Sequence, residues 1–181
     1  AVHETSLVGW KPPDAIGTVD LVAGGVPCPP FSIAGKQLGQ DDDRDMFPAI
    51  LDLVEHVEPR AVMIENVRGL LHKKFDSYRE HILGRLLSLG YEAEWELLEA
   101  ADFGVPQLRP RSVLVAARRD VWQYFKWPTP TARVTTVGEA LHELMGSAGW
   151  EGASAWAAEA QDIAPTLVGG SKKHGGADLG P

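Results

Sequence analysis

The stretch Val19-Asp20-Leu21-Val22-Ala23-Gly24-Gly25 runs directly into Val26-Pro27-Cys28-Pro29-Pro30-Phe31-Ser32, which contains the only cysteine of the chain. The first part is a short apolar run ending in two glycines, which predicts a buried strand that leads into a loop. The prolines around Cys28 restrict the backbone and remove amide donors, so we expect a loop of fixed shape. In open α/β sheets, ligands bind just beyond the carboxyl end of such a strand. Cys28 is therefore a candidate nucleophile; the alternative is a small buried apolar residue.

The composition is that of a globular protein with one full core. The chain has 181 residues, of which 44% are hydrophobic, and it carries 17 Lys and Arg against 25 Asp and Glu, a net charge of −8. A single cysteine excludes an internal disulfide and a multi-cysteine metal site, and it fits a reducing cytoplasm. No apolar run reaches the roughly 20 residues of a membrane span. We expect no metal and no membrane association, and the negative charge argues mildly against nucleic acid.

The first half of the chain predicts a strand, a helix and a second strand. The expected strand at 18–23 is followed by a helix from Asp45, with apolar residues at three- and four-residue spacing, that ends at Glu58-Pro59. The apolar run at 61–64 predicts the second strand, which ends at Glu65-Asn66-Val67. Such a unit has parallel strands buried on both faces. Because both strands then end at the same edge of the sheet, we expect Glu65 beside the cysteine loop.

The second half predicts a helix at 77–89 and then strands at 91–97 and 112–117 that pair as a hairpin at the sheet edge. The run Gln107-Leu108-Arg109-Pro110-Arg111 falls in the connection between these strands. Thr136 and Glu139 have capping-box spacing before a short helix at 140–145. Residues 146–181 are rich in Gly, Ala and Ser, and we expect no core of their own there.

Three signals converge in chain order: Pro27-Cys28, then Glu65-Asn66-Val67, then Gln107-x-Arg109-x-Arg111. This combination, together with the run Pro27-Cys28-Pro29-Pro30-Phe31-Ser32-Ile33-Ala34-Gly35-Lys36-Gln37, resembles the C5-cytosine DNA methyltransferases between Asp20 and about Ala117. The glutamine that usually follows the cysteine is Pro29 here. The resemblance implies part of a Rossmann-like class I methyltransferase sheet, α/β with parallel strands and a C-terminal edge hairpin. It implies a catalytic-core portion at 1–126, and at 127–181 a linker and the beginning of a target-recognition region.

The resemblance also implies roles for these residues in methylating a cytosine that is flipped out of double-stranded DNA. The Cys28 thiolate adds to carbon 6 of the base, and Glu65 protonates or hydrogen-bonds ring nitrogen N3. Arg111 stabilises charge on O2, and Arg109 buttresses Glu65 or the loop. The methyl donor is S-adenosyl-L-methionine. Further residues expected to contact substrate are Pro27, Ser32, Arg44, Asn66 and Gln107, and the expected cofactor contacts are Pro27 and Phe47.

Other interpretations remain open. The glycine-rich nucleoside-binding motif expected before the first strand is absent, as is the Asn-Ala-Val-type motif that closes the cofactor pocket of the family. We therefore expect a fragment of a longer enzyme that is inactive alone, and a methyltransferase-like module that binds or scaffolds without catalysis is the alternative. Methylation of RNA is less favoured, because the common RNA C5-methyltransferases pair two cysteines. A restriction endonuclease acting on the same DNA site is a possible partner.

Overall fold

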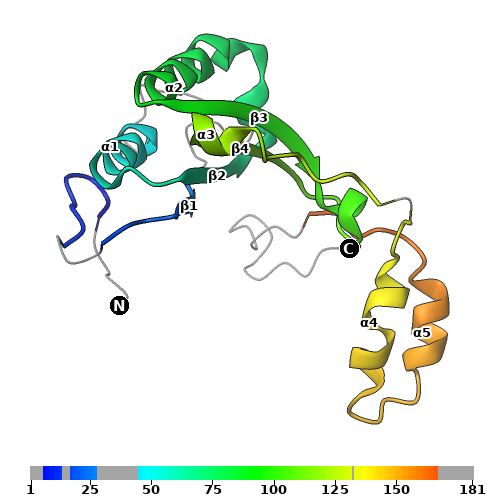
Figure 1. The fold of residues 1–181 in the computed structure, drawn as a ribbon. Coiled ribbons are helices and arrows are strands. Elements are labelled where there is room, and N and C mark those ends of the chain that lie inside the picture. The colour runs from blue at the N-terminus through cyan, green and yellow to red at the C-terminus, as the bar shows by residue number, and fades with distance from the viewer. Residues whose placement is uncertain (1–5, 14–16, 28–44, 132, 167–181) are drawn as a thin grey trace, which may run out of the picture. The chain divides into compact units, whose positions relative to one another are not determined.

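The computed structural model describes residues 6–13, 17–27, 45–131 and 133–166 (Figure 1). Cys28, Ser32 and Arg44 lie outside the described residues. The described part divides into two compact units, one made of residues 1–98 and 110–128 and the other of residues 99–109 and 129–181. Each unit is described separately below.

The elements of the first unit form a mixed sheet with helices packed on it. In chain order they are β1 (Leu21–Gly25), α1 (Phe47–Val57), β2 (Ala61–Val67), the short 3₁₀ turns η3 (Arg68–Leu71) and η4 (Lys73–Phe75), α2 (Asp76–Ser88), β3 (Tyr91–Glu99), β4 (Pro110–Arg118) and α3 (Arg119–Trp122). The strand order is β1-β2-β4-β3. β1 runs parallel to β2, and β4 runs antiparallel to β2. The predicted α/β sheet is confirmed, and β3 and β4 are neighbours as expected.

The two helices form because their apolar residues recur with helical spacing. The Asp45 Oδ1 atom accepts a hydrogen bond from the Phe47 backbone N–H at 3.0 Å, and Pro48 lies in the first turn of α1. The helix ends at Glu58, which has a left-handed backbone with φ of 44°. Both helices pack on the sheet through one core, whose members include Ile50, Leu51, Val54, Val62, Ile64, Ile82, Leu86 and Leu114.

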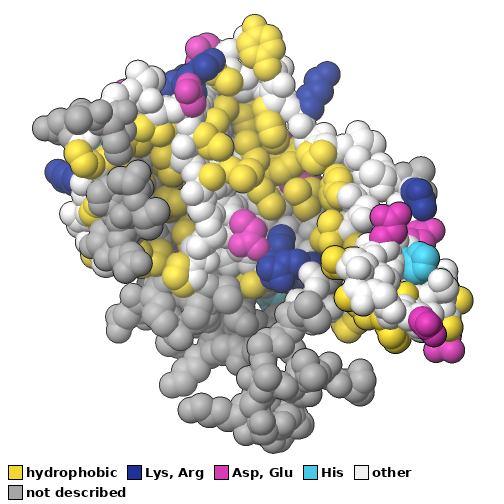
Figure 2. Space-filling model, turned by 90° about the horizontal axis from the view of Figure 1, so that it is seen from below, with side chains coloured by type: hydrophobic (Ala, Val, Ile, Leu, Met, Phe, Trp, Pro, Cys, Tyr) yellow, Lys and Arg dark blue, Asp and Glu magenta, His cyan; other side chains and the backbone are white. Residues whose placement is uncertain are grey.

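Only one face of the sheet is covered by the described residues, which corrects the expectation of strands buried on both faces. Val62 and Ile64 of β2 point into the core and are fully buried, whereas Met63 between them is 45% exposed. Leu21 of β1 is 52% exposed. Figure 2 shows this side of the molecule, where hydrophobic side chains gather on the surface. Successive residues of a strand point to opposite faces of the sheet. Helices α1 and α2 both pack on one face, so the residues of β1 and β2 that point to the other face are exposed.

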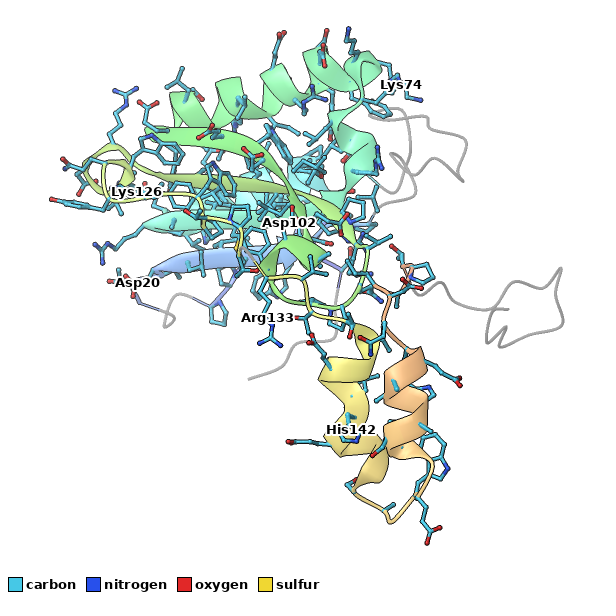
Figure 3. The ribbon with its side chains drawn as sticks, turned by 90° about the vertical axis from the view of Figure 1, so that its right-hand side faces the viewer. Asp20, Lys74, Asp102, Lys126, Arg133 and His142 are labelled. Carbon is cyan, nitrogen blue, oxygen red and sulfur yellow. The ribbon has the colours of Figure 1, made fainter. Side chains whose placement is uncertain are left out.

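The second unit contains a helical hairpin. It comprises η5 (Ala100–Phe103), α4 (Val137–Gly146) and α5 (Ala153–Glu159), and α4 and α5 lie side by side in Figures 1 and 3. The predicted capping box is confirmed, because the Thr136 side chain accepts from the Glu139 N–H and the Glu139 carboxylate from the Thr136 N–H. Residues 146–181 were expected to form no core of their own, and α5, which lies in this segment, packs on α4. A Cβ atom on Gly138 would lie 2.2 Å from the Ala157 carbonyl oxygen, so the two helices pack at very close approach.

Candidate active site

The sheet brings Glu65 and Arg111 together at one edge. Gly25, the last residue of β1, pairs in register with Glu65 of β2, and Val67 of β2 pairs with Arg111 near the start of β4. Arg111 Nε lies 2.5 Å from Glu65 Oε1, while the Arg111 and Glu65 side chains are 20% and 44% exposed. Arg111 also donates from Nη1 to the Pro110 carbonyl at 2.9 Å. The ends of β1 and β2 therefore meet at one edge of the sheet, as expected, and the cysteine loop itself lies outside the described residues.

Asn66 fastens the end of β1 to β2. Its side chain is 1% exposed, and its Nδ2 atom donates to the Val26 carbonyl oxygen at 3.5 Å. Its Oδ1 atom accepts from the Val67 backbone N–H at 2.8 Å. A buried amide has to be hydrogen-bonded, because an unpaired polar group in the interior costs free energy. Asn66 therefore fixes the backbone two residues before Cys28.

Two residues of the site were not recognised from the sequence. Ser112 is fully buried, pairs in register with Asn66, and donates from Oγ to the Val67 carbonyl at 3.0 Å. Gly25 lies so close to Glu65 that a Cβ atom there would be 3.2 Å from Glu65 Oε2. Ser112 looked like the first residue of an apolar strand, and Gly25 looked like a turn residue. Two signals in the sequence could have identified them. Ser112 places a hydroxyl group beside the Arg-x-Arg run, and Gly25 is a glycine at the strand position opposite a carboxylate.

The environment of Glu65 differs from the dry pocket that general-acid chemistry at N3 requires. Its side chain is half-exposed on the uncovered face of the sheet, and it is paired with a guanidinium. In this arrangement the carboxylate can accept hydrogen bonds, and Arg111 can donate to an acceptor next to it. Chemically, the site offers a paired carboxylate and cation at a strand edge, at the end of β1 that leads in sequence to Cys28.

The other predicted site residues are distributed more widely. Pro27 is exposed directly after the Val26 carbonyl that Asn66 contacts. Gln107 and Arg109 belong to the second unit, where Gln107 forms an isolated bridge with Ala164 and the Arg109 backbone N–H donates to Glu99. The described residues thus bring together Glu65, Asn66 and Arg111 from the predicted set.

Phe47 belongs to the core of the first unit, and its expected contact with a cofactor stays a prediction. Its ring is 1% exposed and packs against Tyr78 and Trp95, with centroids 5.9 and 6.0 Å away. The cavity beside it has a volume of about 250 Å³, and residues of α1 and α2 line it, not residues of the strand ends. Sites for ligands of cofactor size have volumes of roughly 300–1,000 Å³. This cavity is therefore smaller than a typical site for a ligand of the size of S-adenosylmethionine.

Among residues 6–13, 17–27, 45–131 and 133–166, no helix is long and apolar enough to span a membrane. Within the same ranges, no three His, Cys, Asp or Glu side chains gather in an arrangement that suits a metal ion.

Comparison with known proteins identifies close relatives. The family model described as C-5 cytosine-specific DNA methylase matches residues 8–174. Type II methyltransferase M.NaeI of Lentzea aerocolonigenes is 64% identical over 163 residues, which cover 90% of this chain and 40% of that protein. Type II methyltransferase M.NgoMIV of Neisseria gonorrhoeae is 54% identical over 151 residues, which cover 83% and 48% of the respective chains. The chain thus spans less than half the length of these two relatives.

Solved structures share the fold at lower identity. A DNMT2 variant of Spodoptera frugiperda superposes with a TM-score of 0.50 and 24% identity, covering 68% of this chain and 39% of that chain. The methyltransferase EhMeth of Entamoeba histolytica has a TM-score of 0.50 and 18% identity, covering 66% and 38%. The Rossmann-like methyltransferase sheet predicted from the sequence is therefore confirmed.

Proposed function

The chain belongs to the family of C-5 cytosine-specific DNA methylases, and we propose that it is the catalytic-core part of an enzyme that methylates carbon 5 of cytosine in double-stranded DNA. The observation that carries the proposal is the pairing of Arg111 Nε with Glu65 Oε1 at 2.5 Å, at the sheet edge where β1 leads to Cys28. A thiol, a carboxyl group and a guanidinium are the three groups that this reaction needs around one flat base.

The chemical problem is that carbon 5 of cytosine is a weak nucleophile. The Cys28 thiolate adds to carbon 6, so that a carbon–sulfur bond forms and the electrons of the 5,6 double bond move into the ring. The bound base covers the half-exposed Glu65 and excludes water, so that Glu65 can donate a proton or hydrogen bond to N3. Arg111 stabilises the negative charge that develops on O2. Once carbon 5 carried the methyl group that the donor would supply, a base would remove the carbon 5 proton, the carbon–sulfur bond would break, the 5,6 double bond would be restored and Cys28 would leave as the thiolate. We assign no side chain to that base, which leaves water.

The remaining residues position these groups. Asn66 holds the backbone before Cys28, and its hydrogen bond to the Val26 carbonyl supports this role. Pro27, Ser32, Arg44 and Gln107 are proposed to contact the DNA or the flipped base, and Arg109 to buttress the catalytic groups. S-adenosyl-L-methionine supplies the methyl group in this chemistry. Only the activation of the cytosine is assigned to named side chains.

The cellular setting follows from the named relatives, which are Type II methyltransferases. We propose that the complete protein acts on cytoplasmic DNA, and that a restriction endonuclease that recognises the same DNA site accompanies it. The second candidate function is a module that binds DNA without catalysis. The observation that favours it is that the sequence contains neither the glycine-rich nucleoside-binding motif nor the Asn-Ala-Val-type motif of the family.

A covalent trap distinguishes the two functions. The complete methyltransferase is incubated with S-adenosylmethionine and a DNA duplex that contains 5-fluorocytosine, whose fluorine blocks the final elimination. We expect a protein–DNA adduct that peptide mapping places on Cys28 and that the Cys28→Ser variant does not form. An adduct at another residue would overturn the mechanism, and no adduct despite tight DNA binding would favour the non-catalytic module.

The role of Glu65 is tested separately. We expect Glu65→Gln to slow methyl transfer far more than it weakens DNA binding, because the amide keeps the shape of the side chain and loses the acidic proton. Leu87→Ser, at an exposed position on α2, is the matched control and leaves both properties unchanged. Equal losses of rate and affinity for Glu65→Gln would indicate a binding role.

A further inference from the structure

Gly25 lies against the carboxylate of Glu65. It is the last residue of β1 and pairs in register with Glu65 across the parallel β1–β2 ladder. A Cβ atom at position 25 would lie 3.2 Å from Glu65 Oε2, which is closer than carbon and carboxylate oxygen normally pack. Any side chain at this position therefore has to displace the Glu65 carboxylate.

The backbone itself does not require glycine at position 25. Its φ angle lies outside the left-handed region that favours glycine, unlike those of Gly9, Gly17, Gly90, Gly104 and Gly149. Within a strand, glycine is unfavourable because it loses more conformational freedom on folding than other residues and packs no side chain. The feature of the structure that a larger residue would disturb is the neighbouring carboxylate.

The two carboxylate oxygens of Glu65 have different neighbours. Oε1 is paired with Arg111 Nε at 2.5 Å, whereas Oε2 is the atom next to Gly25. A carboxylate is rigid and planar, so a displacement of Oε2 also moves Oε1 relative to the guanidinium. The glycine therefore affects the geometry of the ion pair although it makes no polar contact with it.

We propose that Gly25 is a positioning residue for the catalytic pair. By having no side chain, it leaves room for the Glu65 carboxylate to pair with Arg111 through Oε1 while Oε2 stays available to the substrate. This proposal rests on the proposed function, because it takes Glu65 as the group that acts on the base. It assigns to the second glycine of the Gly24-Gly25 pair a steric role that is separate from forming a turn.

Gly24 provides a matched control within the same strand. A Cβ atom at Gly24 would meet Ile50 Cδ1 at 3.7 Å, an ordinary van der Waals distance, because this position faces the core and not the ion pair. Gly24→Ala and Gly25→Ala therefore make the same chemical change in neighbouring residues of one strand. Only the second one displaces Glu65.

The experiment has one readout that does not depend on activity. In the 181-residue chain, the ¹⁵N resonance of Arg111 Nε reports its ion pair with Glu65. We expect Gly25→Ala to shift this resonance, and Gly24→Ala to leave it in place. In the complete methyltransferase, Gly25→Ala should lower kcat by about ten- to a hundredfold, as expected for a misplaced catalytic group, and Gly24→Ala by less than about twofold.

A double variant tests the steric cause. Glu65→Asp withdraws the carboxylate from position 25, so it should lower kcat much less in the Gly25→Ala background than in the unmodified enzyme. An unchanged Arg111 resonance in Gly25→Ala would overturn the proposal. Equal loss of kcat and of thermal stability in both glycine variants would show a general weakening of the strand and would also overturn it. If no adduct forms on Cys28 with 5-fluorocytosine DNA, only the proposed function is contradicted, because the shift of the Arg111 resonance does not depend on catalysis.

Discussion

The strand-end site and the α4–α5 hairpin are built in opposite ways. At the site, Glu65 and Arg111 come from segments far apart in the chain, and the polar side chains of Asn66 and Ser112 are buried and hydrogen-bonded between strands. In the hairpin, two helices separated by a short turn pack directly on each other, and the close approach at Gly138 allows it. The site depends on the register of the whole sheet, whereas the hairpin depends on neighbouring segments alone.

The two regions also differ in charge, and the difference bears on where DNA is contacted. Residues 134–166, which include the hairpin, contain no Lys or Arg, and they carry Glu139, Glu143, Glu151, Glu159 and Asp162. Contacts to DNA phosphates need cations. Residues 134–166 therefore offer no cationic side chain from Lys or Arg to a DNA phosphate, and the target-recognition role of residues 127–181 stays a prediction.

The largest expected effect is on the reaction, at the strand-end site. In the complete methyltransferase, Arg111→Gln removes the cation that stabilises charge on the base, and we expect kcat to fall by about 10²- to 10³-fold. Arg118→Gln is the control, because Arg118 lies at the opposite end of β4 and pairs with Glu58 at 3.1 Å. Methyl-transfer kinetics measure both. If Arg111→Gln and Arg118→Gln lose activity equally, Arg111 does not act on the base, and the strand-end site is not the catalytic region.

The next effect tests the close packing of the hairpin. Gly138→Ala places a methyl group 2.2 Å from the Ala157 carbonyl oxygen, and backbone cannot yield as a flexible side chain does. We expect a loss of stability of about 3 kcal/mol, the upper part of the range for overpacking, confined to the hairpin. Gly84→Ala is the control: no heavy atom is within 4 Å of its Cβ, and α2 should gain about 0.5–1 kcal/mol. Amide hydrogen exchange shows which residues lose protection. Loss of protection in β2 would contradict the prediction that the destabilisation is confined to the hairpin.

The buried amide of the strand-end site comes third. Asn66→Ala leaves the Val67 N–H and the Val26 carbonyl without their side-chain partner, and we expect a loss of about 2 kcal/mol in urea unfolding. Gln123→Ala, at an exposed position, should change the free energy of unfolding by less than about 0.5 kcal/mol. A loss for Asn66→Ala no larger than that of the control would mean that the site does not depend on interstrand hydrogen bonds.

The smallest effect concerns Tyr78, whose hydroxyl donates to Asp45 Oδ2 at 2.5 Å. Tyr78→Phe should cost about 1 kcal/mol at neutral pH. Burial, and then the hydrogen bond to Asp45, raise the pKa of Tyr78 above its ordinary value. Above about pH 10 the unfolded chain loses the tyrosine proton while the folded chain keeps it, so stability falls as pH rises.

Unfolding curves between neutral and alkaline pH test this sign. The Tyr78→Phe variant should lose less stability above about pH 10 than the unmodified chain, because its side chain cannot ionise. Tyr124→Phe is the control, since Tyr124 is 78% exposed. If the stability of Tyr78→Phe fell more steeply with rising pH than that of the unmodified chain, Tyr78 would not be the group whose raised pKa causes the alkaline loss of stability.

Most of the sheet unit could be predicted from the sequence, because its elements carry clear periodicity. The spacing of Ile50, Leu51 and Val54 predicted α1, and the apolar run after Pro59 predicted β2. Helix α5 was not predictable in this way. Its residues 153–159 are mostly alanines without an apolar period, and the helix packs where Gly138 of α4 allows close approach. That contact is tertiary, and no local pattern records it.

The site could be predicted in part. Parallel strands end at one edge, so Glu65 could be placed beside the loop of Cys28. The ion pair of Glu65 with Arg111 was not predicted, because the two residues were given separate contacts with the base. The pair requires β4 to lie between β2 and β3, and strand order within a sheet depends on long-range packing. Phe47 lies in the core, and an apolar ring after a loop has the same sequence pattern whether it faces a ligand or the core.

The register of β2 with β4 has a consequence for the order of folding. Val67 pairs with Arg111 only after the chain between them has closed a long loop, and loop closure costs conformational entropy before any contact repays it. Helices α4 and α5, by contrast, are joined by a short turn and can pair early. The ion pair of Glu65 with Arg111 is therefore expected among the last contacts to form during refolding, which makes it a kinetic marker of the completed sheet.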